Sequence, residues 1–514
     1  MSARLRELKT WFPTGTAEGE RQILERAFVY VSEFESIISP PDGSPILLVG
    51  RKGTGKSALV DFAQKILRND DVPAILLKPE DFDTAPLGDA ASSGESIRSF
   101  RSVVLKSIIS KLAQDMPNFI TGDRAVIYNE AIRSGELSPD LIGRIARILP
   151  TIAKPIVNAD LSSVLPAISS STRDEIEKAV ERILKGKRFY VFIDDTDQVA
   201  NPEKSGHLNR IWGLILSLRA LCSEIPEIKC VITLRTEVWE RLKRDNAAQR
   251  DQTDHFTNLV VEMSSSNEEI GRIVDRRLEL AAQACELSGE MYECFFEGPK
   301  ARAPHSDEYR LWKNLIVTRS RGRPRDAVQL VSAMATEASK NGNSRIKESD
   351  FQKIMPVFSE RRAELFSQEV SQEFSPALDV VRSFSGIDYQ AGSFTMNAEQ
   401  VLKHLTSTLG RHAITLFGKT LHQNSQPDIF DLWRFLYNAN VLNARVSDSS
   451  MPKGFRHLFP EQDPMLVTKS RWNELQAILW EINPAFRDYL IDRQKQQNLS
   501  TGLAVRRPIK KKLR

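Results

Sequence analysis

The stretch Ile46-Leu47-Leu48-Val49-Gly50-Arg51-Lys52-Gly53-Thr54-Gly55-Lys56-Ser57 decides the fold. Its four apolar residues predict a buried strand, and the apolar spacing after Ser57 predicts an amphipathic helix. Between strand and helix stands Gly-x4-Gly-Lys-Ser, the pattern of a loop whose backbone amides bind phosphate groups. The competing interpretation is an incidental glycine-rich turn, which would require neither the strand before it nor the helix after it.

The residue types of this loop fit a nucleoside triphosphate. Its glycines allow backbone conformations that a Cβ would block, so the loop amides can turn toward phosphate oxygens. We expect Lys56 to reach the β- and γ-phosphates, and the Ser57 hydroxyl to ligate Mg²⁺ at the start of the helix. The predicted ligands are therefore ATP and Mg²⁺, with the nucleotide bound by Gly50, Arg51, Lys52, Gly53, Thr54, Gly55, Lys56 and Ser57.

A second apolar run, Phe189–Ile193, ends in Asp194 and Asp195. We expect Asp194 to hold the magnesium ion through its waters, and Asp195 to orient or deprotonate the attacking water. Because Asp195 is one methylene shorter than a glutamate, we also expect slow hydrolysis, below about 10 per second. The alternative is a strand that ends in a solvated Asp-Asp turn, and the phosphate-binding loop elsewhere in the chain argues against it.

Short apolar runs alternate with helical patterns in the first half of the chain. Continuous apolar strands between helices predict a parallel sheet that is covered on both faces. The predicted fold class is α/β, a P-loop NTPase parallel sheet of the ASCE type with a helical insertion, a helical lid and a C-terminal winged-helix domain. The predicted strands are Ile46–Val49, Ala74–Leu77, Phe189–Ile193, Cys230–Leu234 and Leu259–Val261.

Polar residues follow the fourth strand, at the edge where ligands bind in open α/β sheets. Arg235 is predicted to sense the γ-phosphate, although a surface arginine at the start of the next helix explains the same residue. Further on, Ser320–Asp326 is a basic turn before an apolar helix, and Arg325 is the candidate that would fold back onto the nucleotide. The open alternative is a charged helix start, with Asp326 at the positive end of the helix dipole.

A chain of 514 residues is expected to form several domains, because single cores rarely grow beyond about 250–300 residues. A capping box, Ser266 to Glu269, marks the start of a second helical region, and three helices followed by an extended region, Val441–Val467, suggest a winged helix. The predicted parts are a helical lead-in (1–44), a core (45–264) with a helical insertion at about 83–185, a helical lid (265–374), a winged-helix-like domain (375–490) and a basic tail (491–514).

The composition, with 41% hydrophobic and 27% charged residues, is that of a globular protein. The four cysteines lack the close spacing of zinc ligands, and no apolar run is long enough to cross a membrane, so we expect free thiols in a cytoplasmic protein. The net charge is +4, but six basic residues lie in 506–514, and the remainder carries −2. This distribution predicts a basic tail rather than a uniformly basic nucleic-acid-binding surface.

The order of these motifs resembles the STAND ATPases, relatives of the AAA+ class, and the phosphate loop is also similar to that of a bacterial group near the KAP type. The resemblance covers roughly residues 15–490, and only the loop and the Asp-Asp strand are specific. It implies that Arg235 is a sensor and that Gly322 and Pro324 form a lid turn that contacts nucleotide.

The same resemblance places two further roles on less distinctive residues. Where such switches often offer a histidine to the bound diphosphate, this sequence has Asn483, whose amide can still donate to phosphate. The arginine-finger position of AAA+ relatives falls near Arg244 and Arg250, and both also fit as simple surface charges.

Two main functions stay open. The first is a switch that binds ATP and ADP and, in one nucleotide state, assembles with itself or with an effector protein in signalling or phage defence. The second is a DNA-handling AAA+-like loader, against which the expected recognition helix, Asp428–Asn443, carries two aspartates and only Arg434 as a cation. A third function, ATP as structural glue, would not need the intact Lys56, Ser57, Asp194 and Asp195.

Overall fold

The computed structural model describes residues 2–82, 93–115, 123–133, 173–198, 207–244, 256–390, 393–451 and 454–500. The chain forms two compact units. The core unit consists of Tyr30–Arg51 and Lys56–Met263, and the C-terminal unit consists of Met1–Val29, Lys52–Gly55 and Ser264–Arg514. The predicted basic tail from residue 501 onward, much of the predicted insertion, and Arg250 lie outside the described residues.

The core unit contains a five-stranded parallel sheet in the order β2-β3-β4-β1-β5. Strand β4 therefore separates the strand that leads into the phosphate loop, β1, from the acidic strand, β3, which is the ASCE order. The predicted α/β class, a P-loop NTPase parallel sheet, is confirmed, and every strand begins within two residues of its predicted start. The strands are β1 (Ile46–Val49), β2 (Ala74–Leu77), β3 (Phe189–Ile193), β4 (Ile228–Leu234) and β5 (Val260–Glu262).

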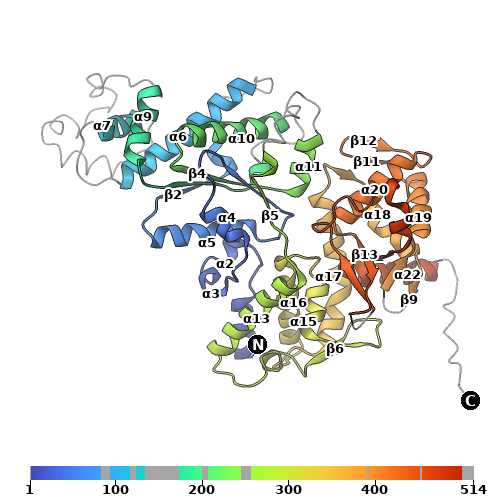
Figure 1. Ribbon diagram of the computed structural model, residues 1–514. Helices are drawn as coiled ribbons and strands as arrows, with labels where there is room; N and C mark the ends of the chain where they lie inside the picture. The colour runs from blue at the N-terminus through green and yellow to red at the C-terminus, as the bar shows by residue number, and fades with distance from the viewer. Residues whose placement is uncertain are drawn as a thin grey trace, which may run out of the picture. The chain divides into compact units, whose positions relative to one another are not determined.

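Helices cover both faces of this sheet (Figure 1). Phe189, Val191 and Ile193 of β3 pack into one hydrophobic core with α6 (Ser93–Asp115) and α10 (His207–Glu224). On the other face lie α4 (Glu33–Ile38) and α5 (Lys56–Asn69). All five residues of β3 are buried, as continuous apolar strands require when both faces are covered.

The described part of the predicted insertion is helical. Helix α6 packs against α10 and against α7 (Asp123–Arg133), which contacts α9 (Arg173–Leu184). Shorter elements of the core unit follow strands β2, β3 and β4 of the sheet. They are η1 (Pro79–Phe82), η4 (Thr196–Gln198) and α11 (Thr236–Arg244).

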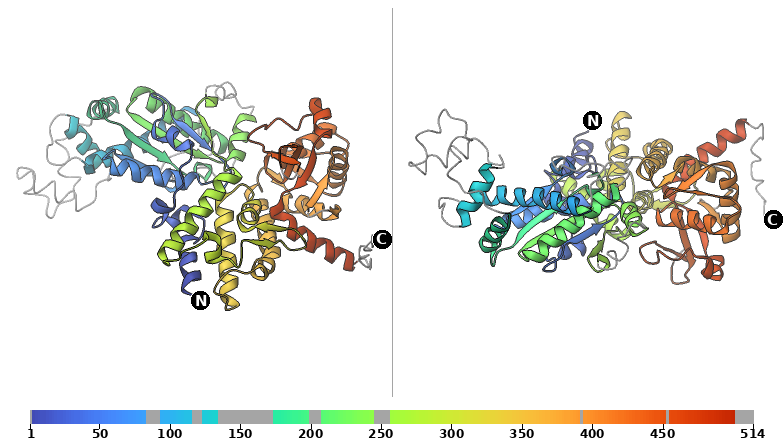
Figure 2. Two further views of the ribbon diagram at one scale, coloured as in Figure 1. Left: turned by 60° about the horizontal axis from the view of Figure 1, so that its bottom comes forward. Right: turned by 90° about the horizontal axis from the view of Figure 1, so that it is seen from above.

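The C-terminal unit joins the start of the chain to helices far along it. Helix α1 (Ala3–Trp11) packs against α13 (Asn267–Ala284) and α16 (Pro324–Lys340), as Figure 2 shows. The capping box predicted at Ser266 is present, because the Ser266 and Glu269 side chains each accept from the other residue's backbone amide. A hairpin that the helical prediction did not include, β6–β7, stands between α14 and α15. The remaining elements here are α2 (Ala17–Glu20), α3 (Leu24–Ala27), α14 (Met291–Phe295), β6 (Lys300–Arg302), β7 (Tyr309–Leu311) and α15 (Trp312–Thr318).

Helix α17 (Glu348–Glu369) takes part in two hydrophobic cores. Phe351 and Met355 in its first half pack with α13 and α16, whereas Ala363 and Phe366 in its second half pack with residues of the chain that follows. The same helix also contacts α22 (Arg487–Ser500) near the end of the chain.

After α17 the described part of the chain adds five α-helices and two small antiparallel sheets. Their strand orders are β14-β13-β15-β10-β9 and β12-β11-β8. The third helix is followed by the hairpin β13–β14, which is the order expected of a winged helix, and that interpretation stays a prediction. The elements are β8 (Phe374–Ser375), α18 (Ala377–Ser383), η5 (Phe384–Gly386), β9 (Tyr389–Gln390), β10 (Ser393–Met396), α19 (Ala398–Arg411), β11 (Ile414–Leu416), β12 (Lys419–Leu421), α20 (Gln426–Asn438), β13 (Leu442–Ser447), β14 (Phe455–Leu458), η6 (Lys469–Arg471), α21 (Trp472–Gln476), β15 (Leu479–Ile482) and η7 (Pro484–Phe486).

Candidate functional site

The phosphate loop leaves the sheet directly after β1. The Gly50 amide donates to the carbonyl of Leu234 on β4 at 3.1 Å, so the loop starts at the carboxyl edge of the sheet. Gly53 and Gly55 have φ angles of +85° and +105°, in a region that side-chain-bearing residues rarely adopt. Helix α5 begins at Lys56, which puts the positive end of its dipole at the loop. These backbone conformations are compatible with the predicted phosphate loop.

Lys56 lies folded against this loop. Its Nζ donates to the carbonyls of Gly50 and Arg51 at 2.6 and 3.1 Å. Burial lowers the pKa of Lys56 to about 8, although the carboxylates of Glu237, Asp197 and Asp194 act in the opposite direction. A bound phosphate would favour the charged amine in the same way as these carboxylates.

The register of the sheet brings Asp194 to the same edge. Ile193 pairs with Ile232, and Val49 pairs with Leu234, so the ends of β1, β4 and β3 are aligned. Neighbouring strands lie about 4.8 Å apart, so the ends of β1 and β3 are separated by roughly two such spacings. The phosphate loop and the acidic strand end therefore share one sheet and one edge.

Thr233 on the intervening strand links the two aspartates. Its Oγ1 donates to Asp194 Oδ1 at 2.6 Å and accepts from the Asp195 amide at 3.2 Å. Asp194 is 7% exposed, so this short hydrogen bond fixes a largely buried carboxylate. Asp195 follows in a left-handed conformation, φ +52°, and turns the chain into η4. The sequence places Thr233 near the polar end of its strand but does not indicate its contact with the two aspartates.

Arg235 lies at this edge as well, and its guanidinium is already paired. Its Nε lies 2.9 Å from Asp197 Oδ2, and the two side chains are 24% and 10% exposed. The predicted sensor is thus held by a carboxylate of η4, which the sequence did not indicate. Arg244, the described member of the two arginine-finger candidates, is the last residue of α11.

The predicted lid turn separates into two contacts, both within the C-terminal unit. Arg325 Nε donates to the Gly15 carbonyl at 3.0 Å, and a Cβ built on Gly53 would lie 3.4 Å from Arg325 Cβ. Gly322 adopts φ +69°, and a Cβ there would lie 3.5 Å from Asn440 Nδ2. Pro324 occupies the first position of α16. Arg325 therefore lies beside the phosphate loop, and Gly322 lies beside the residue that follows α20.

Two other predicted positions have structural partners. Asn483 is 3% exposed, and its Oδ1 accepts from the Ala485 amide at 3.0 Å, which caps η7. On α20, the expected recognition helix, Asp428 binds Lys419, and Arg434 Nε donates to the Val467 carbonyl at 2.9 Å. These contacts explain the residues without a ligand.

A magnesium site of the predicted kind needs few protein ligands. It would use the Ser57 hydroxyl, phosphate oxygens and water, with Asp194 behind the water. In the ranges that the structure describes, no group of three or more His, Cys, Asp or Glu side chains is placed to hold a metal ion. Across those same ranges, no helix has the length and apolar character needed to cross a membrane.

Comparison with protein families matches one part of the chain. A family described as the FunZ-associated C-terminal helical domain matches residues 268–367, which extend from α13 into the last turn of α17. A comparison with curated proteins finds no match.

Several solved structures are remotely similar over most of the chain. The Aeropyrum pernix ORC2 protein, in ADPNP–ADP complexes, is 11% identical with 94% of each chain covered and a TM-score of 0.37. The Aeropyrum pernix ORC1 protein in complex with DNA is 13% identical, covers 98% of this chain and 95% of its own, and has a TM-score of 0.32. The Thermotoga maritima RuvB Holliday junction branch migration motor is 13% identical, with 84% and 87% covered and a TM-score of 0.29. TM-scores this low indicate remote similarity only, and the strand order and phosphate loop identify the fold independently of them.

Proposed function

We propose that the protein binds ATP with Mg²⁺, hydrolyses it slowly, and uses the nucleotide state to control its own assembly or its contact with an effector protein. The observation that best supports nucleotide binding is the alignment of the glycine loop, Lys56 and Asp194 at one edge of one sheet. A cation, a helix N-terminus and a buried carboxylate together provide what a magnesium-bound triphosphate requires.

Each residue of the site has a distinct role in binding or hydrolysing ATP. Loop amides and Lys56 would bind the phosphates, and Ser57 and, through water, Asp194 would hold the metal, which would supply positive charge to the phosphates. Thr233 fixes Asp194 and the backbone of Asp195, so that Asp195 can orient a water molecule. Arg235, once released from Asp197, would supply a positive charge to the γ-phosphate.

The proposal includes the domain assignment predicted from the sequence: a core (45–264), a lid (265–374) and a winged-helix-like domain (375–490). Contacts to a γ-phosphate exist in one nucleotide state only, so they can bias a bistable arrangement of domains. A role in signalling or phage defence fits such a switch. The engaged charges of α20 give a DNA-loading function less support.

The test of nucleotide binding is Lys56→Ala, with Lys106→Ala on the exposed side of α6 as the matched loss of a lysine. Ligand at one hundred times its Kd stabilises a protein by about 2.7 kcal/mol, so MgATP should raise the melting temperature of the wild type and of the control. Lys56→Ala should show no rise. A rise preserved in Lys56→Ala would place the nucleotide elsewhere.

The switch requires two further measurements. Steady-state hydrolysis should stay below about 10 per second. Light scattering should give different particle masses with ADP and with a nonhydrolysable ATP analogue, and equal masses would count against nucleotide-driven assembly. The same masses measured with Lys56→Ala should not respond to either nucleotide.

A further inference from the structure

The turn between α15 and α16, together with the first residues of α16, carries an arginine at every second position: Arg319, Arg321, Arg323 and Arg325. The stretch Arg319–Arg325 is called the arginine turn below. The first three arginines are 1%, 2% and 5% exposed. Arginine is almost never buried unless its charge is paired. The partners of these arginines therefore show what the turn is attached to.

Arg321 is attached to the second half of α17 and to residues beyond that helix. Its guanidinium carbon lies 5.1 Å from the ring centre of Phe366 and 4.8 Å from that of Phe486, so two aromatic faces enclose it. Its carbonyl accepts from Asn440 Nδ2 at 3.1 Å, and its Nη2 donates to the Ala439 carbonyl at 3.4 Å. Arg321 has φ +54°, a conformation that costs free energy and persists because these neighbours hold it.

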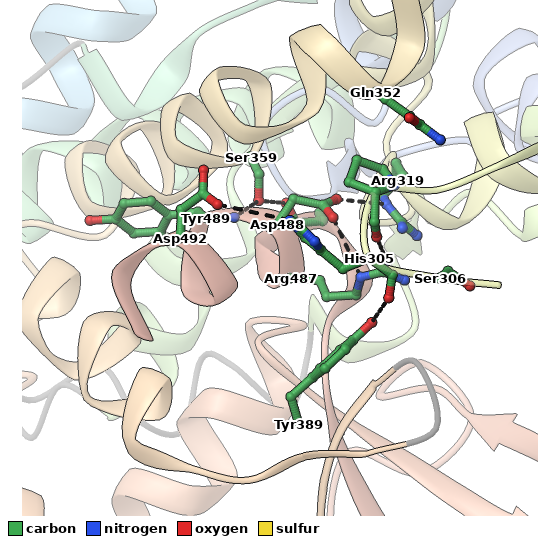
Figure 3. Close-up of polar contacts among 12 residues, drawn as sticks. His305, Ser306, Arg319, Gln352, Ser359, Tyr389, Arg487, Asp488, Tyr489 and Asp492 are labelled. Carbon is green, nitrogen blue, oxygen red and sulfur yellow. Dashed lines mark hydrogen bonds and ion pairs between the residues drawn. The ribbon is translucent and has the colours of Figure 1, made fainter. Parts of the chain in front are cut away.

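The arginines on either side are attached to the same region. Arg323 Nη1 donates to both carboxylate oxygens of Glu369, at 2.9 and 2.7 Å. Arg319 Nε lies 3.4 Å from Asp488 Oδ2 at the start of α22, in the polar cluster shown in Figure 3. Among the described residues, neither carboxylate oxygen of Asp488 has a hydrogen-bond partner. This contact consists of charge attraction without directed hydrogen bonds, so it tolerates small displacements.

The other end of the turn lies beside the phosphate loop. Arg325 donates to Gly15 and lies next to Gly53, as described above. A second connection is electrostatic. Burial raises the pKa of the Glu369 carboxyl, but Arg323, Arg321 and Lys52 of the loop together hold it below its ordinary value. One short turn therefore lies beside the phosphate loop at one end and is bound to residues between Phe366 and Asp488 at the other.

We propose that the segment 375–490 positions this turn and thereby sets the affinity of the phosphate loop for nucleotide, with Asn440 and Arg321 as the positioning residues. Displacement of Asn440 would release the left-handed pair Arg321–Gly322 and shift Arg325 against Gly53. Coupling of this kind is reciprocal, so nucleotide in the loop also changes how tightly the segment holds the turn. This inference rests on the proposed function and adds its regulation.

The decisive variant is Asn440→Gly. Asn440 has φ +57°, which glycine adopts readily, so the change removes the amide contact and keeps the backbone. We expect the Kd for a nonhydrolysable MgATP analogue to rise at least about fivefold, the lower end of allosteric coupling. Ser383→Ala is the control, because the described hydrogen bonds of the Ser383 side chain, with Val380, His404 and Thr408, all lie within its own segment.

A double-mutant cycle tests whether Asn440 affects nucleotide affinity through Arg325. If Asn440 acts through Arg325, then Asn440→Gly should have little effect on affinity in an Arg325→Ala background, and additive effects would overturn the proposal. A Kd for Asn440→Gly within about twofold of wild type would also overturn it, while ATP binding by the wild type would leave the proposed function intact. If the wild type bound no ATP, both would fail. Should Asn440→Gly not fold, Phe486→Leu keeps apolar packing and removes one ring from Arg321, with the same expected result.

Discussion

The nucleotide edge of the core unit and the Arg319–Asp488 pair of the C-terminal unit both bury charge, and they do so in different ways. At the edge, Asp194 accepts a 2.6 Å hydrogen bond from Thr233, and Lys56 donates at 2.6 Å to a carbonyl. At the turn, Asp488 is completely buried, yet its contact with Arg319 is 3.4 Å long. Short directed bonds fix one geometry, whereas longer charge contacts provide attachment that survives rearrangement. The difference distinguishes a site with one fixed geometry from an attachment, Arg319–Asp488, that tolerates movement.

The largest change in stability should come from breaking the Arg319–Asp488 pair. Asp488→Ala leaves Arg319 buried without its partner, and such changes cost about 3–5 kcal/mol in unfolding free energy. Arg319→Met combined with Asp488→Leu removes both charges and should cost far less, while Arg487 keeps its bond to the Pro304 carbonyl. Chemical denaturation of the three proteins compares them. Equal losses in the single and double variants would show that the contact is ordinary packing.

A smaller effect is expected at the site. Thr233→Val keeps the shape of the side chain and removes the donor to Asp194, and leaving a buried acceptor unsatisfied costs about 1–3 kcal/mol. Because the same hydroxyl fixes the Asp195 amide, ATP turnover should fall more than ATP affinity does. Thr420→Val on the exposed strand β12 is the control for stability. Unchanged turnover in Thr233→Val would remove the hydroxyl from the proposed mechanism.

The pH dependence of ATP binding tests whether the pKa of Lys56 lies below that of an ordinary lysine. Since burial lowers its pKa from 10.5 to about 8, the unfolded chain binds a proton between these values that the folded chain lacks. Stability therefore gains a contribution that rises with pH across this window. ATP favours the charged amine, so affinity should fall by up to about tenfold per pH unit above 8. Calorimetry in buffers of different ionisation enthalpy should detect proton uptake on binding near pH 8, and a flat affinity from pH 7 to 9.5 would contradict the shift.

The smallest effect lies outside both regions. Ser266→Ala removes the cap of α13, which should cost about 1 kcal/mol, whereas Ser266→Asn should preserve most of the cap. Neither change should alter ATP affinity, because the cap touches neither the phosphate loop nor the arginine turn among its described bonds. Thermal unfolding and a binding titration on the two variants measure both quantities.

The sequence predicted the loop and the strand ends at the carboxyl edge of the sheet, but it did not predict the contacts of the arginine turn. The reason is physical. The phosphate loop and the acidic strand are local patterns, in which a few consecutive residues specify both backbone and chemistry. Nothing local distinguishes Arg321, which is enclosed by rings, from Arg325, which lies beside the loop, because Asn440 stands 119 residues away from Arg321. Charged residues also suggest a surface by default, so the burial of Arg319 could not be inferred. Strands β6 and β7 have three residues each, too few for a periodic signal.

Helix α17 has a practical consequence for dissecting the protein. It spans 22 residues, about 33 Å, and its last turns and its C-cap supply Phe366 and Val370 to the hydrophobic core of the segment that follows. A C-terminal fragment that starts at the predicted boundary, residue 375, would lose these side chains and expose the apolar residues that pack against them. We therefore expect recombinant C-terminal fragments to be soluble only when they start upstream of Ala363, so that they include the second half of α17.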